Sequence, residues 1–388
     1  MLNFTFHNPT VIYFGKGQIA ALEEELKKRA NKVLVVTGRG SVKKHGIFDE
    51  VLDQVKKAGV GYIEFSGVQP NPRVSSVREG IELCRKEDVD FILAVGGGSV
   101  IDAAKAIAAG VKYDGDVWDF FVTEAGPREA LPVGSVLTVS ATGSEMNPNS
   151  VITNEETRQK LALSAPVIRP VFSVLDPVYT FSVNAYHTAA GISDIMAHVF
   201  EYYLSPVPDT DVQDRLAEGL LKICVNYGPV ACKDPDDYNA RANIMWASTL
   251  ALCGVVGRGR VTDWTCHAIE HEVSALTDVS HGAGLAILMP NFMKVVSGKY
   301  GPGKIAVYGR NVWGIEEAAG DETAAAEAID KTRGFFDSLG LPSTLSEIGL
   351  SEKYFQNIKE GVLWDRGPVE HFPQLTPDDI LKVLTFSL

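Results

Sequence analysis

An acid and a histidine interrupt an apolar stretch of the chain, GISDIMAHVFEYY (191–203), four residues apart. Because an α-helix completes one turn about every 3.6 residues, Asp194 and His198 would share one face of a helix. Two interpretations fit this placement. The pair is either hydrogen-bonded to itself, or it supplies two ligands of one divalent cation, since carboxylate oxygen and imidazole nitrogen suit such ions.

Three of the eight histidines gather within 15 residues further along, in DWTCHAIEHEVSALTDVSHGAGLAILMP (263–290). His267 and His271 are again four residues apart, and His281 precedes the next helix-like run. Asp194 and His198 with two of these three would complete a metal site that keeps a position open for substrate. The spacing predicts a catalytic metal site. It leaves open which two histidines bind the ion and which one lines the pocket as a proton carrier.

A run of three glycines follows a strand-like segment in FILAVGGGSVIDAAKAIA (91–108). Gly97 and Gly98 would let the backbone approach a ligand closely, and a helix starting near Ser99 would direct N–H groups at a pyrophosphate. A tight turn with no ligand is the alternative. Within an alternating α/β segment we expect a dinucleotide-binding site.

A second polar turn, VVTGRGS (35–41), follows another strand-like run. An NAD site usually has an acidic residue here that binds the ribose 2′-hydroxyl, and this turn has none. Arg39 and Ser41, with Lys43 beyond them, can hold a 2′-phosphate instead. The turn therefore favours NADP(H) over NAD(H).

A third polar turn, LTVSATGSEMN (137–147), follows the strand-like run before it. Its hydroxyls suit either a plain turn or the nicotinamide end of a cofactor, and the residues alone leave both interpretations open. Five aromatic or apolar side chains are candidates for the wall of a substrate pocket. They are Trp118, Phe120, Phe121, Val151 and Trp264.

The elements that must position these residues differ between the two halves of the chain. The first 180 residues alternate strand-like and helix-like segments, which predicts a Rossmann-like parallel sheet covered by helices. After Pro177 the segments are amphipathic, helix-length and rarely interrupted by strand signals. We therefore expect an α/β dinucleotide-binding domain at residues 1–180 and an all-helical metal-binding domain at residues 181–388.

The composition is ordinary for a globular protein, with 388 residues of which 45% are hydrophobic and 22% charged. A formal net charge of -13 disfavours nucleic acid or an anionic membrane as partner. No apolar run is long enough to span a membrane, and the N-terminus lacks the pattern of a secretory signal. Five cysteines with no C-x-x-C pair predict reduced thiols and a cytoplasmic protein.

Six segments together resemble the iron-containing (group III) alcohol dehydrogenase family, in particular its NADP-dependent butanol dehydrogenase and aldehyde reductase branch. The resemblance runs in register over nearly the whole chain and implies the dehydroquinate synthase-like fold of that family. It further implies hydride transfer between NADP(H) and a short-chain primary alcohol or aldehyde such as butanol or butanal, in a homodimer that holds Fe²⁺ or, alternatively, Zn²⁺. The segments are FGKG (14–17), QPNP (69–72), GGGSVIDAAKAIA (96–108), SATGSEMN (140–147), GISDIMAHVFE (191–201) and the histidine block at 266–290.

Carried over residue by residue, the resemblance implies four metal ligands: Asp194, His198, His267 and His281. His271 would then be the pocket histidine near the nicotinamide, and Asp194, His267 and His271 the catalytic residues. One segment, GVVGRGRVTDW (254–264), departs from the family pattern and leaves the substrate range open. The implied cofactor contacts are Gly38, Arg39, Gly40, Ser41, Gly97, Gly98, Ser99, Asp102, Thr138, Thr142, Asn147, Lys160 and Tyr179.

Three other functions remain as alternatives. A dehydroquinate synthase shares the fold, but its first metal ligand is a glutamate where this chain has Asp194, and its anionic substrate calls for a basic cluster. The helical half lacks such a cluster, apart from Arg258 and Arg260. A metal-dependent hydrolase would bind no nicotinamide, and a regulatory protein on this fold would bind a dinucleotide without turnover.

Overall fold

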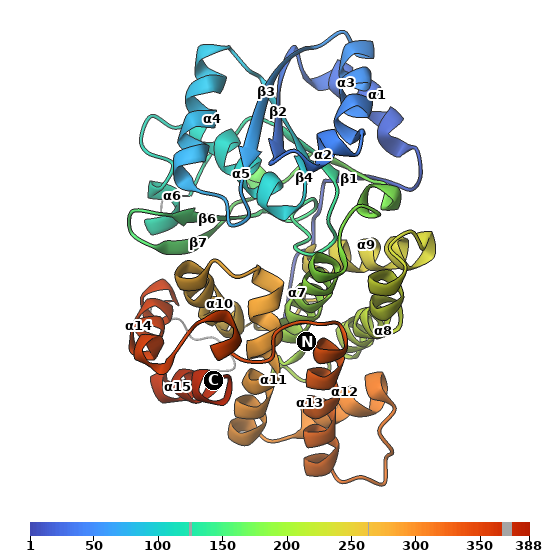
Figure 1. The fold of residues 1–388 in the computed structure, drawn as a ribbon, viewed down its shortest axis with the longest axis vertical. Helices are drawn as coiled ribbons and strands as arrows, with labels where there is room; N and C mark the ends of the chain where they lie inside the picture. The colour runs from blue at the N-terminus through green and yellow to red at the C-terminus, as the bar shows by residue number, and fades with distance from the viewer. Residues whose placement is uncertain (124–125, 263, 367–374) are drawn as a thin grey trace. The chain divides into compact units, whose positions relative to one another are not determined.

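The computed structural model describes residues 1–123, 126–262, 264–366 and 375–388 (Figure 1). The chain forms two compact units, His7–Val183 and a second built from Met1–Phe6 with Asn184–Leu388. The sequence pattern indicated a boundary near residue 180, but it did not indicate that the first six residues belong with the helical unit. They are held there because the amino terminus donates to the Pro208 carbonyl at 2.9 Å and the Leu2 N–H donates to the Gly259 carbonyl at 2.9 Å.

The first unit is built on a parallel sheet in the order β1-β8-β5-β4-β2-β3, with every neighbouring pair parallel. The predicted α/β architecture is therefore confirmed, with β1 as an edge strand that the sequence pattern did not suggest. The strands are β1 (Val11–Phe14), β2 (Lys32–Gly38), β3 (Gly61–Val68), β4 (Phe91–Gly96), β5 (Val133–Leu137) and β8 (Phe172–Leu175).

Alternation along the strands supplies a helix-covered core on each face of this sheet. On one face Val33 and Val35 pack with residues of α1 (Ala21–Arg29) and α3 (Ile47–Lys57). The adjacent residues, such as Leu34, are equally buried on the opposite face, where α4 and α5 contact each other. The other helices of the unit are α2 (Ser41–Lys44), α4 (Val74–Lys86), α5 (Gly98–Val111) and α6 (Asp119–Val122).

An antiparallel hairpin of β6 (Asn149–Asn154) and β7 (Gln159–Ser164) forms a separate two-stranded sheet that contacts α5. The sequence pattern did not indicate this hairpin. Its turn has no glycine, and Arg158 takes the left-handed conformation with a φ of 56°. The hairpin matters for the site because it follows directly on the polar turn at 137–147.

The regular elements of the second unit are all helices in the part of the chain that the structure describes, as expected. Its central helix α7 contacts α8, α9 and α11. A Cβ on Gly282 would lie 1.8 Å from the Ala190 carbonyl oxygen, so only glycine permits the approach of α11 to α7. The helices are α7 (Ala185–Tyr203), α8 (Asp211–Lys233), α9 (Tyr238–Leu252), α10 (Thr265–Thr277), α11 (His281–Tyr300), α12 (Gly303–Trp313), α13 (Asp321–Ser338), α14 (Phe355–Arg366) and α15 (Pro377–Phe386).

Short 3₁₀ helices lie between these elements, and all five cysteines are free thiols. Among the described residues, no helix combines the length and the apolar character needed to cross a membrane. The 3₁₀ helices are Gln18–Ala20, Pro166–Ile168, Pro177–Thr180, Ser346–Ile348 and Glu352–Tyr354.

Candidate metal and cofactor sites

Helix α7 carries the acid and the histidine that the sequence singled out. Its N-terminus is capped by Asn184, whose side chain accepts the His187 N–H at 2.9 Å. Asp194 and His198 are buried within it, 2% and 5% exposed. His198 Nδ1 lies 3.6 Å from Asp194 Oδ1, which is too long for a hydrogen bond. The two residues share a face, but they do not satisfy each other.

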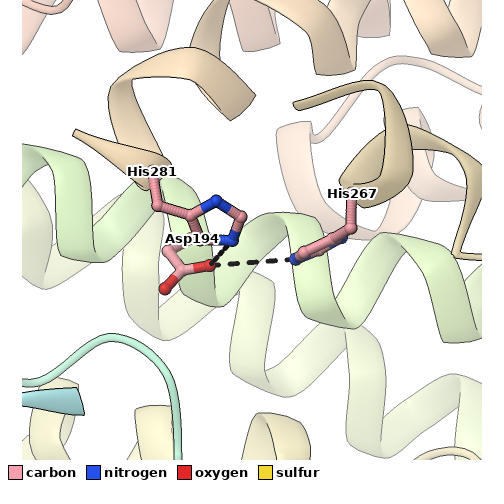
Figure 2. A group of neighbouring side chains, drawn as sticks. All are labelled: Asp194, His267 and His281. Carbon is pink, nitrogen blue, oxygen red and sulfur yellow. Dashed lines mark ion pairs between the residues drawn. The ribbon is translucent and has the colours of Figure 1, made fainter. Parts of the chain in front are cut away.

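Helices α10 and α11 bring two more histidines to the same carboxylate oxygen (Figure 2). His267 Nε2 lies 3.9 Å and His281 Nε2 lies 3.6 Å from Asp194 Oδ1. His281 is the first residue of α11, and Ser280 occupies the N-cap position without a side-chain capping bond. One ligand atom each from Asp194, His267 and His281 lies within 4.8 Å of the other two.

His198 stands slightly apart from that set of three ligand atoms. Its ring stacks on His267 with ring centroids 4.6 Å apart. His198 therefore lines the same buried space as Asp194 and His267, and its role as fourth ligand stays a prediction.

These separations suit a bound cation better than direct hydrogen bonds. Four donors in tetrahedral geometry at about 2.1 Å from an ion are about 3.4 Å from one another. Asp194 Oδ1, His198 Nδ1 and His267 Nε2 are buried without a hydrogen-bond partner in the described part of the chain. Buried polar atoms of this kind are costly unless a ligand satisfies them. The residues thus fit a divalent metal such as Fe²⁺ or Zn²⁺.

The charges in the cluster oppose one another. Burial disfavours the charged form of Asp194, but His198, His281 and His267 outweigh it and lower the pKa of Asp194 to about 2. Burial lowers the pKa of His198 to about 4, with Asp194 opposing. For His267 burial acts in the same direction, yet Glu201 and Asp194 raise its pKa to about 9. Without metal, His267 therefore carries a proton at neutral pH that it must lose to become a ligand.

Two buried carboxylates behind the histidines escaped the sequence analysis. Glu201 contacts His267, and Glu270 contacts His281. A signal was available for both. Glu201 lies seven residues after Asp194 on the same helix face, and Glu270 lies three residues after His267 on α10.

The remaining histidine of the block, His271, lies beside His281 with ring centroids 5.5 Å apart. Trp264 packs edge-on against His267 at 5.3 Å and against His198 at 6.1 Å. Of the five expected wall residues, Trp264 is thus the one placed at the Asp/His cluster. The other four belong to the α/β unit, where Trp118 stacks on Phe121 at 5.1 Å.

The glycine turn after β4 and the polar turn after β5 contact each other. The Thr138 N–H donates to the Gly96 carbonyl at 3.0 Å. A Cβ on Gly98 would lie 2.3 Å from Thr142 Oγ1, and one on Gly97 would lie 3.0 Å from Val139. The structure thereby brings together four expected cofactor residues, Gly97, Gly98, Thr138 and Thr142, beside the start of α5.

The side chains of Asp102 and Asn147 form hydrogen bonds with other residues of the α/β unit. Asp102 accepts the Ser144 hydroxyl and, at 3.0 Å, the Val151 N–H. Asn147 accepts Lys105 Nζ at 3.1 Å through its side-chain oxygen. Lys105 is fully buried, and burial lowers its pKa to about 7. These contacts brace the polar turn against α5, and direct contact of either residue with a cofactor stays a prediction.

Except for Ser99, which directly follows Gly98, the remaining expected cofactor residues lie on other elements of the unit. Arg39 is exposed at the end of β2, and Gly40 has a φ of 107°. Lys43 forms an ion pair with Glu64, so its charge is already compensated. Ser99 lies in the first turn of α5 and Lys160 lies buried in β7. Ser41 begins α2, and the Tyr179 hydroxyl donates to Glu50 at 2.6 Å.

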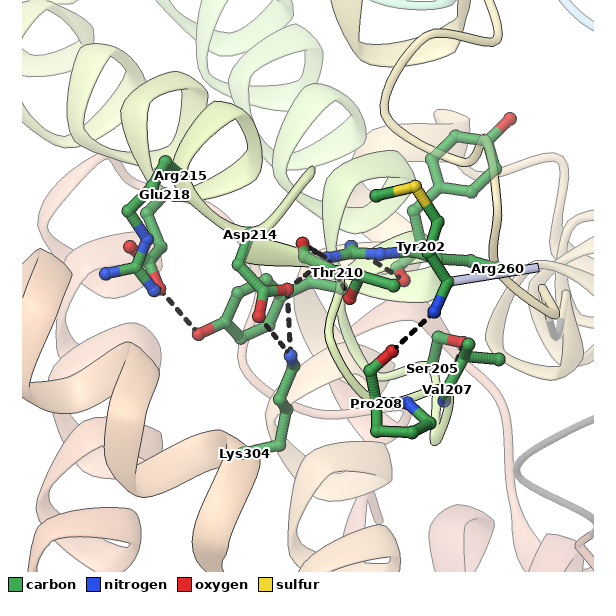
Figure 3. A network of polar contacts seen from close by, with 12 residues as sticks. Tyr202, Ser205, Val207, Pro208, Thr210, Asp214, Arg215, Glu218, Arg260 and Lys304 are labelled. Carbon is green, nitrogen blue, oxygen red and sulfur yellow. Dashed lines mark hydrogen bonds and ion pairs between the residues drawn. The ribbon is translucent and has the colours of Figure 1, made fainter. Parts of the chain in front are cut away.

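Arg260, one of the two arginines in segment 254–264, is a structural anchor (Figure 3). The side chain of Arg260 is buried and donates to the Tyr202 carbonyl at 3.2 Å, to Thr210 and to Asp214. Lys304 Nζ donates to the same Asp214 at 2.6 Å. Arg260 therefore ties the end of α7 to the start of α8. Its charge is compensated, which argues against the anionic-substrate site that a dehydroquinate synthase would need.

Comparison with known proteins agrees with this geometry. The sequence profile of the family "Iron-containing alcohol dehydrogenase" matches residues 9–177, and that of "Fe-containing alcohol dehydrogenase family, C-terminal" matches residues 188–388. NADH-dependent butanol dehydrogenase A of Clostridium acetobutylicum is 46% identical over 388 residues, which is 100% of both chains. NADPH-dependent aldehyde reductase YqhD of Escherichia coli is 42% identical over 353 residues, 90% of each chain.

A solved structure agrees as well. The crystal structure of NADH-dependent butanol dehydrogenase A from Thermotoga maritima matches with a TM-score of 0.95 at 39% identity, covering 100% of this chain and 99% of that one. The names of these relatives specify NADH in two cases and NADPH in one, so the comparisons leave the choice of nicotinamide open. The sequence, the fold and the Asp/His cluster agree that the chain belongs to the iron-containing alcohol dehydrogenase family.

Proposed function

We propose that this chain is a metal-dependent, NADP(H)-linked enzyme that interconverts short-chain primary alcohols and aldehydes such as butanol and butanal. The observation that carries the proposal is that ring nitrogens of His198, His267 and His281 converge on the buried Asp194 Oδ1 in a chain of this family. A cytoplasmic homodimer is part of the same proposal. Light scattering on the purified chain tests the dimer.

Asp194, His198, His267 and His281 would hold the metal, Fe²⁺ in the first place and Zn²⁺ as the alternative. A cation held there supplies Lewis acidity toward a carbonyl oxygen, and a reduced nicotinamide supplies hydride. Asp194 contributes the negative charge of the site, because its low pKa keeps it ionised throughout the physiological range. Trp264 packs against His267 and His198 and covers part of the cluster with apolar surface.

His271 is the proposed proton carrier. Its ring lies next to that of His281 and is only partly buried, so an imidazole nitrogen of His271 can exchange protons with solvent. In the reductive direction it would deliver a proton to the oxygen of the alcohol product, and in the oxidative direction it would accept that proton. The turns at 96–99 and 137–142 would bind the dinucleotide through backbone N–H groups and hydroxyls.

The preference for NADP(H) is supported by the turn after β2. Arg39 is exposed there, and no acidic residue lies between Thr37 and Lys43 to repel a 2′-phosphate. The names of the relatives point both ways, to NADH in the butanol dehydrogenases and to NADPH in YqhD. The preference therefore depends on Arg39 and on the absence of an acid, and needs its own measurement.

Steady-state kinetics with butanal tests both parts of the proposal. The metal-loaded chain is expected to oxidise NADPH in the presence of butanal, with kcat/KM for NADPH above that for NADH. A ratio below one would refute the cofactor preference while leaving the reaction class intact. No butanal-dependent oxidation of either nicotinamide by metal-loaded chain would refute the reaction itself.

A further inference from the structure

Glu201 holds His267 at two points. The backbone N–H of His267 donates to Glu201 Oε1 at 3.1 Å, and the ring Nδ1 lies 3.2 Å from Glu201 Oε2. The opposite ring nitrogen, Nε2, faces Asp194. Glu201 is 2% exposed, and it lies on the same face of α7 as Asp194 and His198. The contact of Glu201 Oε2 with the ring is an ion-pair distance without hydrogen-bond geometry in the described part of the chain, so the backbone hydrogen bond is what fixes the position of His267. The buried negative charge of Glu201 favours the proton on the nearby Nδ1 and so leaves Nε2 free to face Asp194.

Glu270 holds His281 in a similar way from α10. Its Oε2 contacts His281 Nδ1, and its Oε1 accepts the Ser274 hydroxyl. Glu270 is completely buried. The space for its carboxylate comes from Gly284 on α11, because a Cβ there would lie 2.7 Å from Glu270 Oε1 and 2.9 Å from its Cγ. The His281 Nε2 is left facing Asp194.

We propose that Glu201 and Glu270 are positioning residues that hold the Nε2 atoms of His267 and His281 toward Asp194 and so set the affinity of the metal site. This inference rests on the proposed metal site. A carboxylate that accepts the second N–H of a ligating imidazole fixes its tautomer and increases its basicity. Gly284 contributes to the positioning of His281, because the absence of a side chain at Gly284 leaves space for the Glu270 carboxylate.

The two carboxylates should respond differently to replacement by glutamine. Glutamine offers one acceptor oxygen and one NH₂ donor group. At position 201 both partners are N–H donors, so one of the two contacts to His267 must be lost. At position 270 one partner is the Ser274 hydroxyl, which can accept from NH₂ instead, and both contacts can persist. Glu201→Gln is therefore the more damaging of the two changes.

The test is Zn²⁺ affinity of the full chain, measured by competition with a chromophoric chelator, and the visible spectrum of the Co²⁺ form. Glu201→Gln is expected to raise the Kd for Zn²⁺ by about 10- to 100-fold and to change the Co²⁺ bands. Glu270→Gln is expected to raise the Kd for Zn²⁺ by about tenfold or less. Glu218→Gln is the matched control. Glu218 is a buried carboxylate of the same unit that accepts Tyr203 at 2.9 Å, away from the histidines, so its replacement should leave the Kd unchanged.

A second variant breaks the Glu270 contact without touching either partner. Gly284→Ala should raise the Kd by displacing the buried carboxylate, and in a Glu270→Ala background it should add little, because the atoms it would meet are gone. Thermal unfolding of the metal-free variants separates loss of fold from loss of affinity. A Gly284→Ala effect of equal size in both backgrounds would overturn the role of Glu270.

His267→Ala separates failure of this inference from failure of the proposed metal site. If His267→Ala loses Zn²⁺ while Glu201→Gln keeps the wild-type Kd and Co²⁺ spectrum, the positioning role is wrong and the metal site stands. If His267→Ala binds Zn²⁺ as wild type does, the cluster is not the metal site and both proposals fall.

Discussion

The two candidate binding regions of this chain differ in the groups that they offer to a ligand. The turns at 96–99 and 137–142 present backbone and small side chains, and their shape depends on glycines at which any Cβ would meet a neighbour. The Asp/His cluster consists of ionisable side chains that are buried on α7 and α10 and partly buried on α11. Backbone N–H groups bind the phosphates of any nucleotide alike, whereas a cluster of fixed donors selects an ion by charge, distance and chemistry.

This difference predicts how each region fails. A buried cluster loses its function when one donor is removed, because the other donors remain buried and unsatisfied. A binding turn loses its function when an added side-chain atom clashes with a neighbour, and it tolerates small side chains that point into solvent. Substitutions in the two regions should therefore affect different steps, metal binding in one and dinucleotide binding in the other.

The largest effect is expected from His267→Ala. Removing this donor should lower kcat with butanal by about 1000-fold or more, the equivalent of several kcal/mol of barrier. The affinity for NADPH, measured by quenching of protein fluorescence, should stay close to that of wild type. Wild-type turnover in this variant would contradict the assignment of the cluster.

Gly98→Ala should act on the other region. The new Cβ would meet Thr142 Oγ1 at 2.3 Å, so the turn must open. We expect the Kd for NADPH to rise by about 10- to 100-fold, the affinity change that corresponds to roughly 1.4 to 2.7 kcal/mol, while Zn²⁺ content is unchanged. Gly219→Ala, at an exposed position of α8 where a Cβ meets nothing within 4 Å, is the matched control. Equal effects on NADPH in the two variants would show that the turn does not bind the dinucleotide.

Metal affinity should depend on pH through His267. Because the pKa of His267 is about 9 without metal, ligation below that pH displaces one proton. The affinity for Zn²⁺ should rise by about tenfold per pH unit between pH 7 and 8 and level off above about pH 9. The stability of the metal-free fold should change with pH in the opposite direction to the Zn²⁺ affinity. A raised pKa of His267 stabilises that fold at low pH, and this contribution is lost as the pH rises through 9. Calorimetry in buffers of different ionisation enthalpy counts the protons, and release of none would contradict this account.

Much of the cluster could be predicted from spacing, because i and i+4 on one helix guarantee a shared face. That rule placed Asp194 beside His198. It could not decide between His271 and His281, since His281 reaches Asp194 from a separate helix that only tertiary packing brings close. It also gave no weight to Glu201 and Glu270, because acids on an amphipathic helix usually face solvent.

The α/β unit could be predicted less completely. Strand and helix alternation indicated a parallel sheet, but the strand order depends on long-range pairing. The β6–β7 hairpin is local, and it could not be predicted because its turn has none of the glycine signals typical of a hairpin. Asp102 illustrates the limit. The family resemblance implied a dinucleotide contact for it, and its carboxylate accepts the Ser144 hydroxyl and the Val151 N–H, partners that no local sequence pattern indicates; the cofactor contact stays a prediction.

The smallest effect is expected at the turn after β2. Gly38→Asp should shift the ratio of kcat/KM from NADPH toward NADH by about fivefold, since like charges at an exposed site repel by about 1 kcal/mol. Gly38→Ala is the control, because a Cβ there meets nothing closer than 3.6 Å and adds no charge. An unchanged ratio in Gly38→Asp would place the 2′-phosphate elsewhere.

The central claim is that the Asp/His cluster holds one divalent cation on which hydride transfer depends. Its most direct test is to titrate metal-free chain with Fe²⁺ under anaerobic conditions, or with Zn²⁺, and to follow butanal-dependent oxidation of NADPH. The account predicts no oxidation without metal and a rate that saturates at one ion per chain. Oxidation at the full rate by metal-free chain would contradict it.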